Sequence, residues 1–469
     1  MSSLVWFRDD LRLHDHPALY AASLRPEPLQ AIYFVTPDQW KKHDLAAIKA
    51  DLLARQLNQL GSELAVAGIP LTVLTVADYQ AIPAQLTAFC QQHDITHLFV
   101  NRDIGEYELQ RDLAVQQQCD ANNIPVQWFD ARCLFAPGSV LTGSKEMFKV
   151  FTPFSRAWLK KLATEGYRVW PKPLARGAAL SWSSIGISYP RTDSSDWPVG
   201  EAAVLQRLQD FCSEKLRQYG EQRDFPACPG TSQLSPYLAL GIISVRQCLA
   251  AIEAALGQLP FERGAPGFIW LNELIWREFY QHLLVAFPHL SKHKAFKPET
   301  DHIRWLWDES RFTAWCEGKT GYPIVDAAMR CLNQTGWMHN RLRMIVASFL
   351  TKDLHIDWRL GERYFMQHLI DGELAANNGG WQWAASTGAD AAPYFRIFNP
   401  TTQGQRFDEQ GRFIKQWLPE LQNVPEKYIH TPHDWLKIYD PTNSYPSPIV
   451  DHAQAREITL ALFKHSQAL

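Results

Sequence analysis

The chain has 469 residues, 46% of them hydrophobic and 20% charged, with a net charge of −3. The composition is typical of a globular protein of two or three domains, and the charge argues against a uniformly basic nucleic-acid binder. No apolar run is long enough for a membrane span, and the start lacks a secretory pattern. The eight cysteines form no Cys-x-x-Cys pair, which disfavours disulfides or a metal site and favours a cytoplasmic location.

The first 130 residues alternate between strand and helix patterns. Short apolar runs predict five strands, at 4–7, 31–35, 71–76, 96–100 and 126–129. The clearest helical pattern between them runs from Leu45 to Ala67, where leucines recur at helical spacing. This alternation predicts an α/β domain with a parallel, Rossmann-like sheet. The Gly-x-Gly-x-x-Gly and P-loop sequences that usually bind phosphates in such folds are absent.

Prolines and serines are frequent from 131 to 200 and predict a long interdomain linker. After Glu201, helical periodicity continues to the last residue and predicts an all-helical domain. The expected organisation is an α/β domain at 1–130, a linker at 131–200 and a helical domain at 201–469. Residues 1–130 carry a net charge of −7 and residues 131–469 one of +4, so a polyanionic partner should contact the second part.

The run from Asn377 to Trp383 combines amides, glycines and indoles more densely than any other stretch. Glycines let the backbone approach a ligand closely, and amides form hydrogen bonds with a heteroaromatic edge. Indoles stack on flat rings or carry electrons. The run therefore predicts a site for a planar aromatic cofactor.

A predicted helix over 270–280 places polar and aromatic side chains on one face. Trp270, Glu273, Trp276, Arg277 and Tyr280 follow helical spacing. Such a face suits the wall of a pocket for a flat polar ring. An ordinary salt-bridged helix surface is an equally good interpretation of this segment alone.

Two further segments suit parts of a nucleotide. Asn340 and Met344, four residues apart in a helical pattern, offer an amide for a base edge and a polarisable thioether. A solvated charged face is the alternative. Ser235 and Pro236 predict a helix start with Ser235 as N-cap, and its free N–H groups suit a pyrophosphate. Simple capping is the more frequent role of such a start.

Taken together, these segments resemble the DNA photolyase/cryptochrome family over essentially the whole chain. The resemblance rests on Trp6–Asp15, on Gly318–Ala327, on Gly336–Arg341 and on the run from Asn377 to Pro400. The nearest likeness is to microbial cyclobutane pyrimidine dimer photolyases of the folate-antenna type. It implies light-driven repair of UV-damaged DNA, in which excited reduced FAD gives one electron to a flipped-out pyrimidine dimer.

The resemblance implies that the helical domain binds FAD and that Asn377 faces the redox-active nitrogen of the flavin. Glu373 stands where the family usually has aspartate, and a contact through the backbone would make this change nearly silent. Trp381, Trp358 and Trp305 match the family's electron-transfer chain from flavin to surface. The positions implied for FAD are Tyr219, Thr231, Ser232, Gln233, Leu234, Ser235, Trp270, Arg343, Asp371, Gly372, Glu373 and Asn377.

The resemblance also implies residues for the lesion and the DNA strand. Trp276 and Trp383 would stack on the flipped bases, at about 1–3 kcal/mol per base. Glu273 and Asn340 would bind the pyrimidine edges, and Glu273 would also stabilise the radical anion. The whole set is Arg223, Glu273, Trp276, Arg277, Tyr280, Asn340, Arg341, Met344, Trp383, Arg396 and Gln403.

An antenna chromophore is implied for the α/β domain. His43, Glu108 and Lys292 match family positions for methenyltetrahydrofolate, whereas Tyr107 replaces the usual asparagine and Ser291 the usual cysteine. Folate is the expected antenna, with a deazaflavin or an empty site as alternatives. A monomer without an obligate protein partner is expected.

Other members of the family are weighed by single positions. A photolyase for the (6-4) photoproduct should have paired histidines where this chain has His339-Asn340. A DASH-type photolyase, which prefers single-stranded DNA, usually alters the pocket tryptophan, and Trp276 is present here. A cryptochrome-type blue-light photoreceptor commonly has another residue in place of Asn377. The DASH-type enzyme and the photoreceptor are kept as alternatives.

Overall fold

The computed structural model describes residues 1–466, and their side chains as far as Lys464. The contacts divide the chain into two compact units. The first unit comprises residues 1–217, 232–291 and 371–373, and the second comprises 218–231, 292–370 and 374–469. This grouping by contacts differs from the domain boundaries expected near residues 130 and 200. Those boundaries stay a prediction.

A five-stranded parallel sheet forms the centre of the first unit. Its strands are β1 (Ser2–Phe7), β2 (Leu29–Val35), β3 (Leu71–Thr75), β4 (Ile95–Asn101) and β5 (Val126–Phe129), in the order β3-β2-β1-β4-β5. Each predicted strand is confirmed to within two residues. Every residue of β1 is buried, as expected for a parallel strand covered on both faces.

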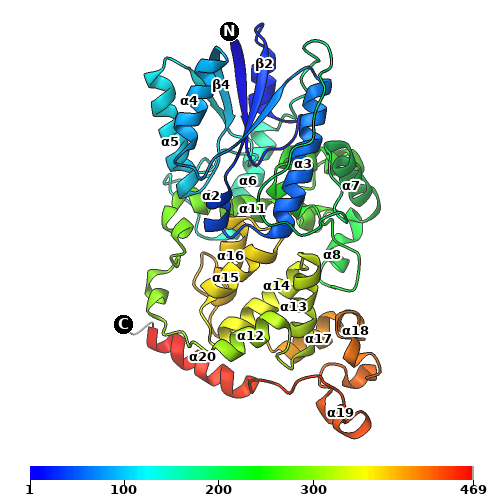
Figure 1. Ribbon diagram of the computed structural model, residues 1–469. Helices are drawn as coiled ribbons and strands as arrows, with labels where there is room; N and C mark the ends of the chain where they lie inside the picture. The colour runs from blue at the N-terminus through cyan, green and yellow to red at the C-terminus, as the bar shows by residue number, and fades with distance from the viewer. Residues whose placement is uncertain (467–469) are drawn as a thin grey trace. The chain divides into compact units, whose positions relative to one another are not determined.

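The helices of the first unit cover this sheet and extend beyond it. Helices α4 (Ile82–Gln92) and α5 (Glu106–Ala121) lie together on one side of the sheet, and α3 (Ala47–Val66) lies on the other (Figure 1). The predicted helix over 45–67 is thus confirmed. The remaining helices are α1 (Pro17–Ser23), α2 (Pro37–Lys42), α6 (Phe151–Glu165), α7 (Glu201–Glu214), α9 (Ser235–Ala239), α10 (Val245–Leu256) and α11 (Phe268–Ala286).

Helix α6 lies within the segment 131–200, which is expected to be a long interdomain linker and for which no helix was predicted. Prolines and serines cluster only after residue 170, whereas 151–165 form a regular helix that buries Phe154, Trp158 and Leu162. The prolines and serines after residue 170 dominate the composition of the whole segment. Composition alone therefore does not reveal this 15-residue amphipathic helix.

The second unit is helical throughout its described residues, apart from turns and irregular segments. Its α-helices are α8 (Tyr219–Gln222), α12 (Glu309–Glu317), α13 (Pro323–Thr335), α14 (Asn340–Ser348), α15 (Trp358–His368), α16 (Leu374–Ala385), α17 (Pro400–Phe407), α18 (Arg412–Trp417), α19 (His433–Tyr439) and α20 (His452–Ser466). Their core includes Trp315, Trp358 and Trp381. The predicted class, an α/β domain followed by helices, is confirmed.

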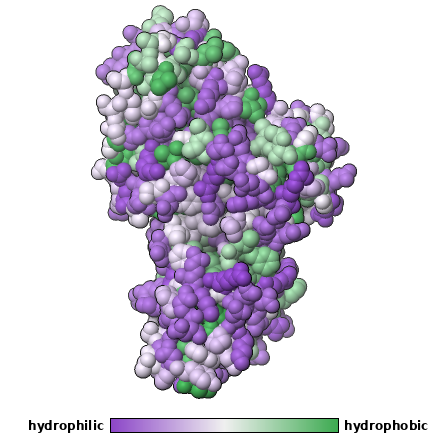
Figure 2. Space-filling view, turned by 90° about the vertical axis from the view of Figure 1, so that its right-hand side faces the viewer, coloured by the Kyte–Doolittle hydropathy of each residue, from purple (hydrophilic) through white to green (hydrophobic). Residues whose placement is uncertain are grey.

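The surface and the sulfur chemistry agree with the composition. Hydrophilic residues predominate on the face shown in Figure 2, and apolar residues form small separate groups there. All eight cysteines are free. Within residues 1–466, no helix combines the length and the apolar character that crossing a bilayer requires.

A buried lysine occupies a π-helical turn, Phe349–Asp353, that follows α14. The ammonium group of Lys352 donates to Ser386 Oγ at 2.8 Å and lies 3.5 Å from the carbonyl oxygen of Arg396. Burial lowers the pKa of Lys352 to about 7. Burial also raises the pKa of the adjacent Asp353 to about 6, although His452 Nδ1 lies 2.5 Å from its carboxylate.

Lys352→Met should gain stability relative to the wild type as the pH falls from about 10 to about 7. In that interval the unfolded lysine is protonated and the buried one is neutral, so the wild type loses about 1.4 kcal/mol per pH unit. Urea unfolding across this range measures the difference. Lys319→Met, at an exposed lysine, serves as the control, and parallel stability curves for Lys352→Met and wild type would contradict the prediction.

Candidate active site

Charged side chains gather at the carboxyl edge of the sheet in the first unit. Arg8, Asp9 and Asp10 directly follow β1, and together with Arg132 and Arg277 they line part of a small cavity. The strand order reverses between β1 and β4. In open α/β sheets this is the edge where ligands bind, so the predicted Rossmann-like sheet has its polar groups at the expected place.

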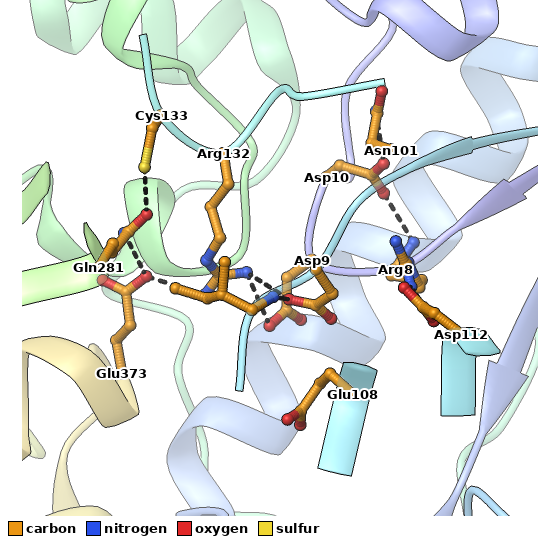
Figure 3. A network of polar contacts seen from close by, with 12 residues as sticks. Arg8, Asp9, Asp10, Asn101, Glu108, Asp112, Arg132, Cys133, Gln281 and Glu373 are labelled. Atoms are coloured by element: carbon orange, nitrogen blue, oxygen red, sulfur yellow. Dashed lines mark hydrogen bonds and ion pairs between the residues drawn. The ribbon is translucent and has the colours of Figure 1, made fainter. Parts of the chain in front are cut away.

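Glu373 is the central acid of this network (Figure 3). Its carboxylate accepts hydrogen bonds from Arg132 at 2.8 Å, Arg277 at 2.8 Å and Gln281 at 3.0 Å. Arg132 also lies 3.6 Å from Asp9. Burial alone would raise the pKa of Glu373, but the charges of Arg277 and Arg132 outweigh it and hold that pKa below its usual value. The side chain of Glu373 is thus taken up by these arginines, and the expected FAD contact through its backbone stays a prediction.

Arg277 is committed to the same network. Its guanidinium donates to Glu373 through two nitrogens and to the carbonyl oxygens of Arg132 and Leu238 at 3.2 Å each. Most of its N–H groups are thus used inside the first unit. The predicted DNA contact of Arg277 stays a prediction, and a phosphate that binds its guanidinium would compete with the buried carboxylate of Glu373.

The predicted aromatic face lies on α11. Trp270 is 4% exposed and packs on Phe211, with ring centroids 4.9 Å apart. Trp276 and Tyr280 lie 5.6 Å apart. Phe151, from the first residue of α6, stacks on Trp276 with centroids 3.6 Å apart and the planes inclined by 5°. One face of Trp276 is therefore covered by the protein, and only the opposite face is left for a base.

Three of the predicted antenna residues come together in the first unit. The ring of His43 lies 5.6 Å from that of Tyr107, and its Nδ1 lies 3.6 Å from Glu108. Tyr79, which the sequence did not single out, donates to Glu108 at 3.3 Å. Burial, together with the negative charge of Asp103, raises the pKa of Glu108 to about 7.

The helix start at 235 differs from its prediction. Helix α9 begins with Ser235 itself, and the preceding Leu234 has αR geometry and provides no side-chain cap. The hydroxyl of Ser235 donates to Asp371 at 2.6 Å. Ser235 is therefore not the N-cap, because it is the first residue of the helix, and its hydroxyl donates instead to a carboxylate distant in sequence. Arg207 donates to Gln233 Oε1 in the same segment.

The run from Asn377 to Trp383, which predicted a site for a planar cofactor, belongs to helix α16 of the second unit. Asn377 donates its amide N–H to the carbonyl oxygen of Glu362 at 2.9 Å, which leaves the amide oxygen as an acceptor. Trp381, one turn further on, is 2% exposed, and its Nε1 has no hydrogen-bond partner among the described residues. An amide acceptor and an unpaired N–H on one helix face fit the polar edge of a flavin.

The three predicted electron carriers all lie in the second unit. Trp381 and Trp358 are 2% and 0% exposed, whereas Trp305 is half-buried. This change in exposure is what a path from the core to the surface requires. Trp315 contacts Trp381, with ring centroids 6.0 Å apart, and no pattern in the sequence predicts this contact.

The lesion-binding candidates of α14 are arranged as predicted. Asn340 Nδ2 lies 3.9 Å from Met344 Sδ, so the two side chains share a face. Arg341 pairs with Asp224 at 2.8 Å and lies over the ring of Phe407. A phosphate contact by Arg341 would therefore compete with Asp224.

The other predicted site residues stay predictions. Ser291 belongs to the first unit, where its hydroxyl accepts from the backbone N–H of Glu106 at 3.3 Å. Ser232, Gln233, Leu234, Gly372 and Glu273 also belong to the first unit. Those in the second unit are Tyr219, Arg223, Thr231, Lys292, Arg343, Trp383, Arg396 and Gln403.

A group of metal-ligating side chains is buried elsewhere in the first unit. Atoms of Cys133, Glu278 and His282 lie within 4.8 Å of one another. Glu278, however, accepts from Trp158 at 2.6 Å, and His282 Nδ1 accepts from the N–H of Gly138 at 3.1 Å. The neutral imidazole then carries its proton on Nε2 and has no lone pair left for a metal. This group is a hydrogen-bonded part of the core.

Comparison with known proteins agrees with these features. Residues 3–174 match the family model for DNA photolyase, and residues 270–465 match that for the FAD binding domain of DNA photolyase. A deoxyribodipyrimidine photo-lyase of Vibrio cholerae is 51% identical, over 98% of this chain and 99% of the relative. The fold and the site thus define a flavoprotein with a Rossmann-like N-terminal sheet. The chain belongs to the DNA photolyase family and carries its FAD-binding domain.

Solved structures extend the likeness to the whole fold. A bacterial class III photolyase from Agrobacterium tumefaciens has a TM-score of 0.88 at 36% identity and covers 100% of this chain and 98% of its own. A cryptochrome from Synechocystis has a TM-score of 0.85 at 30% identity, with 98% and 99% covered. Photolyases and cryptochromes thus share this fold, so the fold alone does not decide between their functions.

Gly361→Ala should destabilise the protein and displace Trp381. A Cβ atom at Gly361 in α15 would lie 2.1 Å from the Trp381 ring, and overpacking of this kind costs about 1–3 kcal/mol. Gly380→Ala in α16 is the matched control, because a Cβ there would meet nothing within 4 Å. The control should gain up to about 1 kcal/mol from helix propensity. Thermal unfolding and tryptophan fluorescence measure both variants, and equal stability gains would contradict the packing argument.

Proposed function

We propose that this protein is a light-driven deoxyribodipyrimidine photo-lyase that uses FAD to repair cyclobutane pyrimidine dimers in UV-damaged DNA. The observation that carries the proposal is the 51% identity, over nearly the full length, to a deoxyribodipyrimidine photo-lyase. The surroundings of single residues add to it: Trp276 in the first unit, and Asn340, Asn377 and Trp381 in the second, have neighbours that suit the lesion, the flavin and the electron supply. A monomeric cytoplasmic enzyme is part of the proposal.

The lesion is bound outside the DNA stack. Flipping a dimer out costs a few kcal/mol, less than for an intact pair. Stacking returns about 1–3 kcal/mol per base, and we assign it to the face of Trp276 opposite Phe151 and to the ring of Trp383. Phe151 supports Trp276 from behind, since their rings are stacked. This support fixes the plane of the indole before substrate arrives and lowers the entropy lost on binding.

Polar groups on α14 recognise the edge of the flipped pyrimidine. The amide of Asn340 both donates and accepts, which matches the alternating edge of thymine. Met344 lies beside it and offers a polarisable surface to the ring. Glu273, on the same face of α11 as Trp276, provides a further acceptor for the pyrimidine N–H groups.

The flavin, when bound and reduced, supplies on excitation the electron that splits the cyclobutane ring and takes it back afterwards. Asn377 presents its amide oxygen as a fixed acceptor, because its nitrogen is held by Glu362. Trp381 supplies electrons when the flavin has become oxidised. Its burial keeps water away from the indole, and Trp358 and Trp305 carry the charge on toward solvent.

The antenna that we propose is methenyltetrahydrofolate at His43, Tyr107 and Glu108. The carboxylate of Glu108 suits the adjacent N–H donors of a pterin edge, and we assign the half-exposed ring of Tyr107 to stacking on the pterin. A deazaflavin and an empty antenna site are the alternatives.

Repair is tested with an oligonucleotide that carries one thymine dimer, in single-stranded and in double-stranded form. The expected result is restoration of two thymines in blue light and none in the dark, in both substrates. A photoreceptor without repair activity gives no difference between light and dark. A DASH-type preference gives repair of the single strand only.

Trp381→Phe should abolish photoreduction of the flavin and retain repair by chemically reduced enzyme. Phenylalanine fills much of the site of Trp381 but is far harder to oxidise. Flavin absorbance under blue light with a thiol reductant measures the first step, and the dimer assay after dithionite treatment measures the second. Loss of repair in the reduced variant would contradict this division of roles.

Folate affinity should rise with pH up to about 7 and then level off. Protonated Glu108, with its pKa of about 7, offers the pterin one good acceptor, and the carboxylate offers two. Affinity for methenyltetrahydrofolate then changes by up to about tenfold per pH unit below that pKa. Glu108→Gln removes the dependence and Tyr107→Phe retains it. A flat profile in the wild type would exclude Glu108 as the pterin ligand.

A further inference from the structure

Trp381 makes ring contacts in a second direction, away from the predicted carriers. Its ring lies 6.0 Å from that of Trp315, at an interplanar angle of 70°. Trp315 lies on α12 and is 0% exposed. Trp315 thus contacts Trp381 directly, and it is not part of the proposed chain through Trp358 and Trp305.

The surroundings of Trp315 favour passage of a positive charge over its capture. Its indole N–H donates to the carbonyl oxygen of Val346 at 3.1 Å. The partial negative charge of that oxygen stabilises an oxidised ring, but a carbonyl does not accept the proton. An oxidised Trp315 therefore stays a radical cation, which is ready to take an electron from a further donor.

Two aromatic rings lead from Trp315 to solvent. Phe312 stacks near Trp315, with centroids 6.0 Å apart and an interplanar angle of 17°. Trp307 lies 5.9 Å from Phe312 and is 63% exposed. Phe312 is too hard to oxidise to hold the charge, but its ring fills the space between the two indoles.

Tyr364 is the competing donor next to Trp315, and its environment argues against it. Its ring lies 5.6 Å from Trp315, and its hydroxyl donates to Asn333 Oδ1 at 2.7 Å. Burial raises the pKa of Tyr364 well above its usual value. Oxidation of a tyrosine requires loss of its proton, and an amide oxygen is a poor base. Trp307, exposed to water, meets no such obstacle.

We propose that Trp381, Trp315 and Trp307 form a second electron-supply branch, with Phe312 as the bridge between the last two. The inference rests on the proposed role of Trp381 as the first electron donor to light-excited flavin. Oxidised Trp381 takes one electron from Trp315, and oxidised Trp315 takes one from Trp307. Trp307 then releases its indole proton to water, and a thiol reductant restores it with one hydrogen atom.

The branch is tested on the FAD-loaded full chain by flavin photoreduction in blue light with a thiol reductant. Trp305→Phe should retain part of the wild-type rate, because the branch through Trp307 is intact. Trp305→Phe/Trp307→Phe should fall to the level of Trp381→Phe. Trp307 is mostly exposed, so its substitution leaves the fold in place. Trp305→Phe/Trp435→Phe, which removes a tryptophan of α19 instead, should equal Trp305→Phe alone.

Two results overturn the branch while the proposed function stands. One is that Trp305→Phe alone is as inactive in photoreduction as Trp381→Phe. The other is that the Trp305→Phe/Trp307→Phe variant matches Trp305→Phe. Wild-type photoreduction in Trp381→Phe overturns the role of Trp381 and the branch together. Light-dependent repair by reduced enzyme, measured on the same samples, then decides whether the proposed repair function survives.

A second measurement does not depend on flavin turnover. After illumination without a reductant, peptide mass spectrometry should find oxidation products at Trp307. The yield should rise in Trp305→Phe and disappear in Trp381→Phe. Oxidation of Trp307 that is equal in all three proteins reflects exposure alone and overturns the branch.

Discussion

The ion pairs of Glu373 hold together parts of the first unit that are far apart in sequence. Arg132 follows the last strand, Arg277 lies on α11, and Glu373 comes from a three-residue segment whose flanking chain belongs to the second unit. Loss of one partner from a buried ion pair costs about 3–5 kcal/mol, because an unpaired charge is left behind. The neighbouring Asp371 and Gly372, which are proposed FAD residues, therefore depend on this neutralisation for their position.

Aromatic packing around Trp381 is the corresponding constraint in the second unit. Trp315 and Phe365 contact its ring, and Gly361 lacks the Cβ atom that would overlap it. The same close packing that stabilises these helices also excludes water from the indole. A buried oxidised indole has no water to take its proton, so the charge moves on until it reaches an exposed ring. The core thus sets both the stability of this unit and the direction of electron flow.

Local patterns were sufficient for the elements, and they were insufficient for the partners of charged side chains. The five strands and helices α3, α11 and α14 follow from apolar periodicity, because burial of one face acts over a few residues. The N-cap role of Ser235 was predicted wrongly, and the ion pair between Arg277 and Glu373 was not predicted. Arg277 donates to Glu373, 96 residues away in the chain, and Ser235 donates to Asp371, 136 residues away. No local pattern records such a partner.

The sequence by itself determined the fold class, the family and the run that carries Asn377 and Trp381, because periodicity and motifs are properties of neighbouring residues. Only the tertiary structure decided that Phe151 covers one face of Trp276, that Glu373 neutralises two arginines, and that Trp315 and Phe312 connect Trp381 to the exposed Trp307. These contacts join residues from different helices and loops. Their existence depends on how the elements pack, and packing is fixed by the whole core at once.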